Sequence, residues 1–209
     1  MSHAFFILGA GGHAKVVVDA LLRAGHSDIR IFDDDPTKLN TFLLGYALAG
    51  SQQDLIQEFS KNHSAQVVIA VGQNKARFNI YKMCMENAIA LGNAIHPNAV
   101  IASAVHLGQG LMIMAGAIIN SDAYIHDNVI VNTGAVIEHD CLVGSHSHIA
   151  PHATLCGGVQ VGELALIGAG AIVLPGVKIG ESCIVGAGAV VNQDIPAGKT
   201  AVGIPARLT

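Results

Sequence analysis

The sequence predicts an α/β domain with a small parallel sheet over residues 1–94, followed by a parallel β-helix over residues 95–209. Charged residues number 16 in the first part and 10 in the second, longer part. Eight of the nine aromatic residues lie in the first part, whereas 16 of the 24 glycines lie in the second. Aliphatic residues of the second part also recur every six positions. A composition shift this sharp indicates two domains that are built on different principles.

The overall composition excludes several classes of protein. Apolar residues make up 51% and charged residues 12%, against roughly 25% charged in typical domains, so a disordered chain is excluded. A net charge of −4 argues against nucleic-acid binding. No apolar run is long enough to span a membrane, and the first residues lack the pattern of an export signal. The four cysteines show no CxxC spacing and indicate reduced thiols in a cytoplasmic protein.

The first domain alternates predicted strands with predicted helices. Short apolar runs at residues 4–8, 29–32 and 67–71 predict strands. Helical periodicity covers residues 14–24, with Gly25 as a suitable C-cap, and a further helix is expected at about residues 75–88. This alternation is typical of a small, Rossmann-like parallel sheet.

The second domain is a hexapeptide repeat. Every sixth residue from Ile95 to Val191 is Ile, Leu or Val, at all 17 positions, and the residue four places after each is small or apolar. Such a period predicts a β-helix in which three hexads complete one triangular coil. The aliphatic residue points inward, and the small residue allows the wall to turn. Each coil needs its neighbours to bury its interior.

The last residues leave the six-residue register. The segments at residues 194–198 and 203–207 contain Pro and Gly and break the aliphatic period. We expect this tail to cap the open end of the β-helix, which would otherwise expose unpaired strand edges.

A glycine-rich turn follows the first predicted strand. Residues 9–13 read Gly-Ala-Gly-Gly-His, and Ala14 occupies the sixth position of a G-x-G-x-x-G/A fingerprint. Backbone N–H groups of such a turn can bind a phosphate. Asp33 and Asp34 follow the second strand, where a ribose-binding carboxylate would lie. A plain βα turn and a solvated acidic turn are the alternatives, and the small sheet favours a mononucleotide sugar over NAD.

A histidine beside two acids is the candidate for acid–base chemistry. His139 is the third residue of its hexad, hence outward at a corner, and it precedes Asp140. A carboxylate can fix the tautomer of such a base, although a solvated corner histidine is the alternative. His148 lies nine residues on, on an adjacent face, and could donate a hydrogen bond. Cys141 and Cys183 occupy inward positions and are interpreted as packing thiols rather than nucleophiles.

Seven of the 11 histidines follow residue 94, and such a concentration of imidazoles can indicate metal binding. Residues of neighbouring coils stack at a spacing of 18, and none of these seven histidines pairs at that spacing. We therefore expect no zinc site within one chain, while a site between subunits stays open.

Three segments carry a family resemblance that extends over nearly the whole chain. They are Gly-Ala-Gly-Gly-His-Ala-Lys at residues 9–15, Asn-Thr-Gly-Ala-Val-Ile-Glu-His-Asp-Cys at 132–141, and Val-Gly-Ile-Pro-Ala-Arg at 202–207. Together they resemble bacterial nucleotide-aminosugar acetyltransferases of the hexapeptide-repeat superfamily. These include UDP-4-amino-sugar and GDP-perosamine N-acetyltransferases and sialic-acid O-acetyltransferase-like proteins.

The resemblance implies a left-handed β-helix and a homotrimer with active sites between neighbouring protomers. It implies that His139 is the general base and that Asp140, where relatives often carry Glu, raises its basicity. Acetyl-CoA would be the donor, and no metal is expected. The residues matched to acetyl-CoA are His148, Gly157, Ala169 and Ala187, with Gly157 leaving room for the thioester. Those matched to the nucleotide sugar are Gly11, Gly12, His13, Asp33, Asp34 and Gly72.

The predicted activity is N-acetylation of the 4-amino group of a UDP-linked amino-dideoxy sugar. The alternatives are acetylation of GDP-perosamine and O-acetylation of sialic acid or another sugar. More distant alternatives are a zinc enzyme of the γ-carbonic-anhydrase type and a non-catalytic prism. The nucleotide base, the stereochemistry of the sugar and the downstream pathway are not determined by the sequence.

Overall fold

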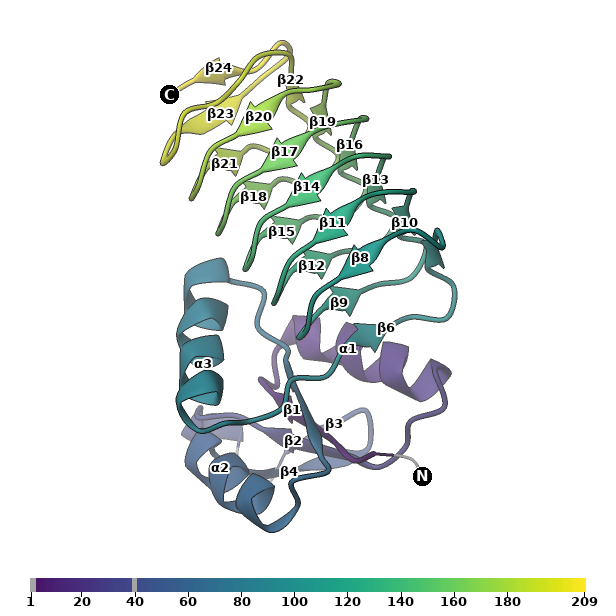
Figure 1. The fold of residues 1–209 in the computed structure, drawn as a ribbon. Helices are drawn as coiled ribbons and strands as arrows, with labels where there is room; N and C mark the ends of the chain where they lie inside the picture. The colour runs from purple at the N-terminus through teal and green to yellow at the C-terminus, as the bar shows by residue number, and fades with distance from the viewer. Residues whose placement is uncertain (1–2, 39–40) are drawn as a thin grey trace.

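The computed structural model describes residues 3–38 and 41–209 and has two parts, an α/β unit and a long stack of parallel strands (Figure 1). The α/β sheet has the order β3-β4-β2-β1-β5. Strands β1 (Phe5–Leu8), β2 (Ile29–Phe32) and β5 (Gln66–Ile69) are parallel and confirm the predicted runs. Helices α1 (Gly12–Arg23) and α3 (Asn74–Glu86) also lie where the periodicity predicts them.

The sequence analysis missed part of this unit. A hairpin of β3 (Phe42–Leu43) and β4 (Tyr46–Gly50) extends the sheet, a 3-10 turn spans Pro36–Lys38, and α2 (Gln52–Lys61) follows. Leu44 and Gly45, at the hairpin turn, both have positive φ, although the turn lacks the Asn-Gly or Asp-Gly pair that usually announces such a geometry. Ser51 and Asp54 form a capping box at the start of α2.

Seventeen two-residue strands form a prism with three faces, and in Figure 1 they appear as a ladder of stacked coils. Sheet pairing divides the strands among the faces. The six-stranded face contains β7 (Val100–Ile101), β10 (Ile118–Ile119), β13 (Val136–Ile137), β16 (Thr154–Leu155), β19 (Ile172–Val173) and β22 (Val190–Val191). The five-stranded face contains β8 (His106–Leu107), β11 (Tyr124–Ile125), β14 (Leu142–Val143), β17 (Gln160–Val161) and β20 (Lys178–Ile179).

The eight-stranded face completes the prism. It contains β6 (Ala94–Ile95), β9 (Met112–Ile113), β12 (Ile130–Val131), β15 (His148–Ile149), β18 (Leu166–Ile167), β21 (Ile184–Val185), β23 (Thr200–Val202) and β24 (Arg207–Leu208). β23 pairs in parallel with β21, and β24 pairs antiparallel with β23. The tail leaves the hexad register as predicted, and it extends one face by β23 before turning back as β24.

Burial follows the six-residue period. Ile119 of β10 pairs with Ile137 of β13, a register of 18 residues or three hexads. Both side chains are completely buried, as are the small residues Ala123 and Ala135, which occupy the position four after an aliphatic residue. The prism is therefore the parallel β-helix that the six-residue period predicts, and it is consistent with the left-handed coil that the resemblance implies.

The α/β unit packs against the eight-stranded face. Buried residues of α1, including Val17 and Leu21, share a hydrophobic cluster with Met112, Met114 and Ile130 of the prism. This apolar contact joins residues that are distant from one another along the chain, and it holds the glycine-rich turn near the prism. Within residues 3–38 and 41–209, no helix combines the length and apolar character needed to cross a membrane.

Candidate active site

The glycine-rich turn leads directly from β1 into α1. Gly9 has φ +112°, and a Cβ there would lie 2.9 Å from the Ala70 carbonyl oxygen, so glycine is required at this close approach. Gly11 is the N-cap of α1, and Gly12 begins the helix; both are exposed. Because a glycine N-cap has no side chain to accept from the first N–H groups, these donors are available to an anion.

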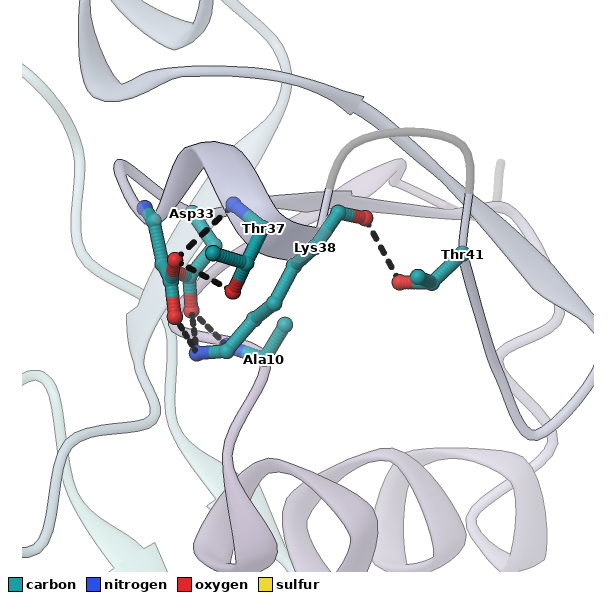
Figure 2. Close-up of polar contacts among 6 residues, drawn as sticks. Ala10, Asp33, Thr37, Lys38 and Thr41 are labelled. Atoms are coloured by element: carbon teal, nitrogen blue, oxygen red, sulfur yellow. Dashed lines mark hydrogen bonds and ion pairs between the residues drawn. The ribbon is translucent and has the colours of Figure 1, made fainter.

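Asp33 ties the second strand to this turn, as Figure 2 shows. Its Oδ2 accepts from the Ala10 N–H at 2.6 Å and pairs with Lys38 Nζ at 2.8 Å. Burial alone would raise the pKa of Asp33, but the hydrogen bonds from Lys38, Asp35 and Ala10 outweigh it and lower the pKa. The carboxylate is therefore ionised at neutral pH, and a lysine cation lies beside the turn.

Asp34 has a different environment from its neighbour. It is exposed, and its Oδ1 accepts from the backbone N–H of Gln52 at 2.7 Å, in the first turn of α2. Asp34 thus helps to cap a helix that the sequence analysis did not predict. Both predicted carboxylates lie at the end of β2, and each already has a backbone partner.

His13, Gly72 and His148 come together where the α/β unit meets the prism. The rings of His13 and His148 lie 6.4 Å apart. Burial, and next the nearby Arg77 cation, lower the pKa of each imidazole to about 4, so both rings are neutral at pH 7. His148 Nε2 lies 3.0 Å from Asn132 Nδ2. Among the described residues, His13 Nε2 is buried and has no hydrogen-bond partner.

Two residues that the sequence analysis did not single out support this junction. Asn132 orients His148 from the preceding coil of the prism. Arg77 of α3 is completely buried and donates to backbone carbonyls of both parts of the molecule. No local sequence pattern marks either residue, because their partners are distant along the chain.

A cleft of about 770 Å³ opens beside this junction, between α3 and the eight-stranded face. Its floor is formed by prism residues, and its rim by polar and basic residues of α3. We call it the α3 cleft; it is lined by Gly72, Gln73, Asn74, Lys75, Phe78, Asn79, Lys82, His148, Leu164, Leu166, Ser182 and Ile184. It therefore joins a residue predicted to bind the nucleotide sugar, Gly72, to one predicted to contact acetyl-CoA, His148.

His139 projects from a corner of the prism, as its place in the hexad predicts. Its side chain is 63% exposed, and Nδ1 lies 2.7 Å from Asp140 Oδ2. The hydrogen bond to Asp140 is the largest effect and, together with the charges of Asp140 and Glu138, it outweighs desolvation and raises the pKa of His139 above its ordinary value. Because Asp140 binds Nδ1, Nε2 remains the nitrogen that can take a proton from a substrate.

Gly157 lies one coil beyond and makes space for the ring of His139. A Cβ on Gly157 would lie 2.7 Å from both Cε1 and Nε2 of His139. In this chain the space at Gly157 is thus filled by the histidine itself. Only a glycine allows the imidazole to lie over the backbone of the next coil.

His139 and His148 lie on opposite sides of the prism in a single chain, so the expectation that they occupy adjacent faces is wrong. The turn that carries His139 joins β13 of the six-stranded face to β14 of the five-stranded face. His148 belongs to β15 on the third face, across from that corner. Ala169 and Ala187 are exposed in turns at another corner, between the eight- and six-stranded faces. One chain therefore does not bring all the predicted site residues together.

The remaining candidates are structural. Cys141 and Cys183 are buried as predicted, and burial raises the pKa of the Cys141 thiol to about 11. Among the described residues, no three His, Cys, Asp or Glu side chains are grouped so that they could hold a metal ion.

Comparison with known proteins matches both parts of the chain. The PglD N-terminal domain family matches residues 4–84, and the bacterial transferase hexapeptide family matches residues 122–157 and 158–193. PerB from Caulobacter crescentus, solved in complex with CoA and GDP-perosamine, is 41% identical, with 99% of this chain and 97% of that chain covered and a TM-score of 0.92.

Two further solved structures are similar over their full length. The acetyltransferase domain of PglB from Neisseria gonorrhoeae, solved with acetyl coenzyme A, is 33% identical, with both chains covered at 100% and a TM-score of 0.94. WeeI from Acinetobacter baumannii is 28% identical, again with 100% of both chains covered, at a TM-score of 0.90. A search of curated proteins found no match.

Fold and site together define an acyltransferase of the hexapeptide-repeat superfamily. More narrowly, the chain belongs to the bacterial nucleotide-aminosugar acetyltransferases, as the resemblance of its three motifs predicts. It is an acetyl-CoA-dependent sugar N-acetyltransferase, and acetyl-CoA is its acyl donor.

Proposed function

We propose that this enzyme acetylates the 4-amino group of a nucleotide-linked amino-dideoxy sugar, with His139 as general base. The observation that carries the proposal is the exposed His139–Asp140 pair, joined at 2.7 Å, with an imidazole of raised pKa and a free Nε2. The exposed N–H groups at Gly11 and Gly12, beside Asp33, supply a site for the diphosphate and ribose of such a sugar.

The transfer is direct. The sugar amine attacks the thioester carbonyl of acetyl-CoA, so that a C–N bond forms while His139 Nε2 takes a proton from the nitrogen. The C–S bond then breaks, and the proton passes from His139 to the departing thiolate of CoA. The N–H of Gly157, beside the imidazole, is a donor that can stabilise the oxyanion of the tetrahedral intermediate. Asp140 stabilises the imidazolium that forms between the two proton transfers.

The proposed site is shared between copies of the chain in a homotrimer. His139 lies across the prism from His148 and the α3 cleft, so a second copy has to supply one of them. Charge supports the pairing: the corner of His139 carries Glu138 and Asp140, while Lys75 and Lys82 line the α3 cleft. Nucleotide sugar bound near Gly72 would then meet the base of the neighbouring protomer.

The nucleotide is either uridine or guanosine diphosphate. The motifs led to the expectation of a UDP-linked sugar, whereas the 41% identical C. crescentus protein was solved with GDP-perosamine, which favours a GDP-linked sugar as the second candidate. Thermal-shift measurements with UDP- and GDP-linked 4-amino sugars separate the two, because a ligand that binds the native state raises its melting temperature. An acetyl-CoA thiol-release assay with amino sugars and with sialic acid separates N- from O-acetylation.

Replacing the base tests the proposal directly. We expect His139→Ala to lower kcat by about 10²- to 10⁴-fold, the typical contribution of a placed base, with little change in CoA affinity. His152→Ala is the matched control, since His152 is another exposed corner histidine and its ring lies over Gly134 as that of His139 lies over Gly157. Turnover that is unchanged in His139→Ala, or equally reduced in His152→Ala, would reject His139 as the base.

A further inference from the structure

Arg77 is the most completely buried charged residue of the described chain, with no exposed surface. It lies in the first turn of α3 and makes six hydrogen bonds of 2.7–3.1 Å. The acceptors are the backbone carbonyls of Val71, Gly72, Asn128, His146 and Ser147, and the side-chain oxygen of Asn74.

None of these acceptors carries a charge. A buried cation without a carboxylate partner is costly, because desolvation is not offset by an opposite charge. Burial lowers the pKa of Arg77 to about 9, so the guanidinium is still protonated at neutral pH. The five donors of a guanidinium point in fixed directions in one plane, which suits a residue that has to hold several carbonyls at once.

The acceptors fall into two groups on either side of the guanidinium. Nη1 holds Val71 and Gly72, in the loop after β5 that borders the α3 cleft. Nη2 holds the carbonyls of His146 and Ser147, directly before His148 on the prism. One planar group therefore binds both sides of the junction.

We propose that Arg77 is a positioning residue that fixes the Gly72 loop, on the nucleotide-sugar side, relative to the prism strand that begins at His148, on the acetyl-CoA side. This rests on the proposed function, because Gly72 and His148 take their roles from it. Arg77 touches neither substrate; it sets the distance between the two parts that bind them. Since misplacement by about 1 Å costs on the order of 10²-fold in rate, small shifts of this junction should slow transfer strongly.

A purely structural contact of the same interface provides the comparison. Tyr81, one turn further along α3, donates from its hydroxyl to Asp127 Oδ2 at 3.2 Å. It joins α3 to the same edge of the prism, and its ring packs edge-on against that of His146, with the centroids 4.7 Å apart, a contact that phenylalanine would keep. Among the described residues, its hydroxyl makes no hydrogen bond to the Gly72 loop or to the backbone before His148. Tyr81→Phe thus removes one hydrogen bond between α3 and the prism but leaves the hydrogen bonds of Arg77 in place.

The test compares Arg77→Lys with Tyr81→Phe in the full-length enzyme. Lysine keeps the charge but cannot reach both groups of carbonyls, so we expect kcat to fall about 10- to 100-fold. Dissociation constants for CoA alone and for UDP or GDP alone, by calorimetry, should change less than about threefold. Tyr81→Phe should keep kcat, whatever its melting temperature. An unchanged kcat in folded Arg77→Lys, or an equal loss in Tyr81→Phe, would overturn the inference.

Amide hydrogen exchange gives a readout that does not depend on activity. Arg77→Lys should raise exchange in the segments 71–74 and 146–149 together, and Tyr81→Phe should leave both unchanged. Protection in Arg77→Lys equal to wild type would contradict the link. If the wild-type enzyme acetylates no nucleotide amino sugar, the proposed function fails, while this comparison still decides the role of Arg77 in the junction.

If Arg77→Lys does not fold, Asn74→Ala replaces it. Asn74 accepts from Arg77 and donates to the carbonyls of Leu164 and Ala165, so its loss loosens the same junction partially. We then expect kcat to fall severalfold with the two exchange segments less protected. Wild-type kcat and wild-type protection in that variant would equally overturn the inference.

Discussion

Histidines of this enzyme differ in protonation because their surroundings differ. His139 is exposed beside Asp140, and that carboxylate raises its pKa. His13, His146 and His148 are enclosed near the Arg77 cation, and burial first and that charge second lower each pKa to about 4. Histidine thus has a raised pKa at the exposed corner and is kept neutral at the buried junction.

The pH dependence of kcat/KM follows from the raised pKa of His139. A general base acts in its neutral form, so activity should fall as the pH drops through that pKa. In Asp140→Asn the hydrogen-bonded charge is gone and the pKa of His139 falls, so the acidic limb moves to lower pH and the plateau rate decreases. Rate profiles over about pH 5–8 measure this. A limb that stays in place would show that Asp140 does not set the basicity.

Gly157 offers a second prediction at this scale. In Gly157→Ala the new methyl group would lie 2.7 Å from His139 Cε1 and Nε2, so the ring has to move. We expect kcat to fall roughly 10- to 100-fold through misplacement of the base. The control is the double variant with His139→Ala, in which the methyl group should cause no further loss. An additive loss would mean that Gly157 acts independently of the imidazole.

At the scale of secondary-structure elements, the position of a residue in the hexad decides which substitutions the prism tolerates. β10 contains two isoleucines with opposite orientations: Ile119 is completely buried, and Ile118 is 36% exposed. Each coil packs only against its neighbours, so a defect in one layer is not compensated elsewhere.

This strand allows a matched pair of substitutions. Ile119→Ala should lower the free energy of unfolding by about 2–5 kcal/mol, since it leaves a cavity in the closed interior. Ile118→Ala removes the same atoms from the outer face and should cost clearly less. Denaturant unfolding of both variants measures the difference, and equal losses would argue against the inward–outward alternation.

At the scale of the whole molecule, the separation of His139 from the α3 cleft decides whether one chain can form the proposed site alone. A protomer presents the proposed base on one corner and the glycine-rich turn on the opposite side. If the site is shared in a homotrimer as proposed, light scattering should give three times the 21.5 kDa chain mass. A monomer that is fully active would contradict the shared site.

Mixing two inactive variants tests whether the active site is shared between protomers. A carboxylate introduced by Gly12→Glu should repel a phosphate, and a Cβ at Gly12 meets no other atom within 4 Å, so the fold should be kept. If the site is shared, trimers refolded from Gly12→Glu and His139→Ala chains regain activity, because some interfaces then combine two intact halves. Separately refolded variants are the control. No recovery in verified mixed trimers would show that both halves belong to one chain.

The sequence by itself determined the elements whose signals are local. A period of six sets the prism and its inward residues, and short apolar runs with a glycine-rich turn set β1, β2, β5 and the start of α1. The adjacency of His139 and Asp140 needs no tertiary information. The β3–β4 hairpin was not predicted because its turn lacks an Asn-Gly or Asp-Gly pair, and α2 was not predicted although Ser51 and Asp54 give a capping-box signal in the sequence.

Only the tertiary structure decided how the two parts meet. Arg77 reaches acceptors 51 and 69 residues away, and the contact of Asn132 with His148 depends on the stacking of coils. The contacts of Arg77 leave no spacing rule in the sequence, because they arise from the docking of a helix against a prism face. Asn132 and His148 instead meet through the 18-residue register of the coils, in which Ile130 pairs with His148. The tertiary structure also decided that His139 lies across the prism from His148 rather than on an adjacent face, and this separation is the basis for the proposed site shared between chains.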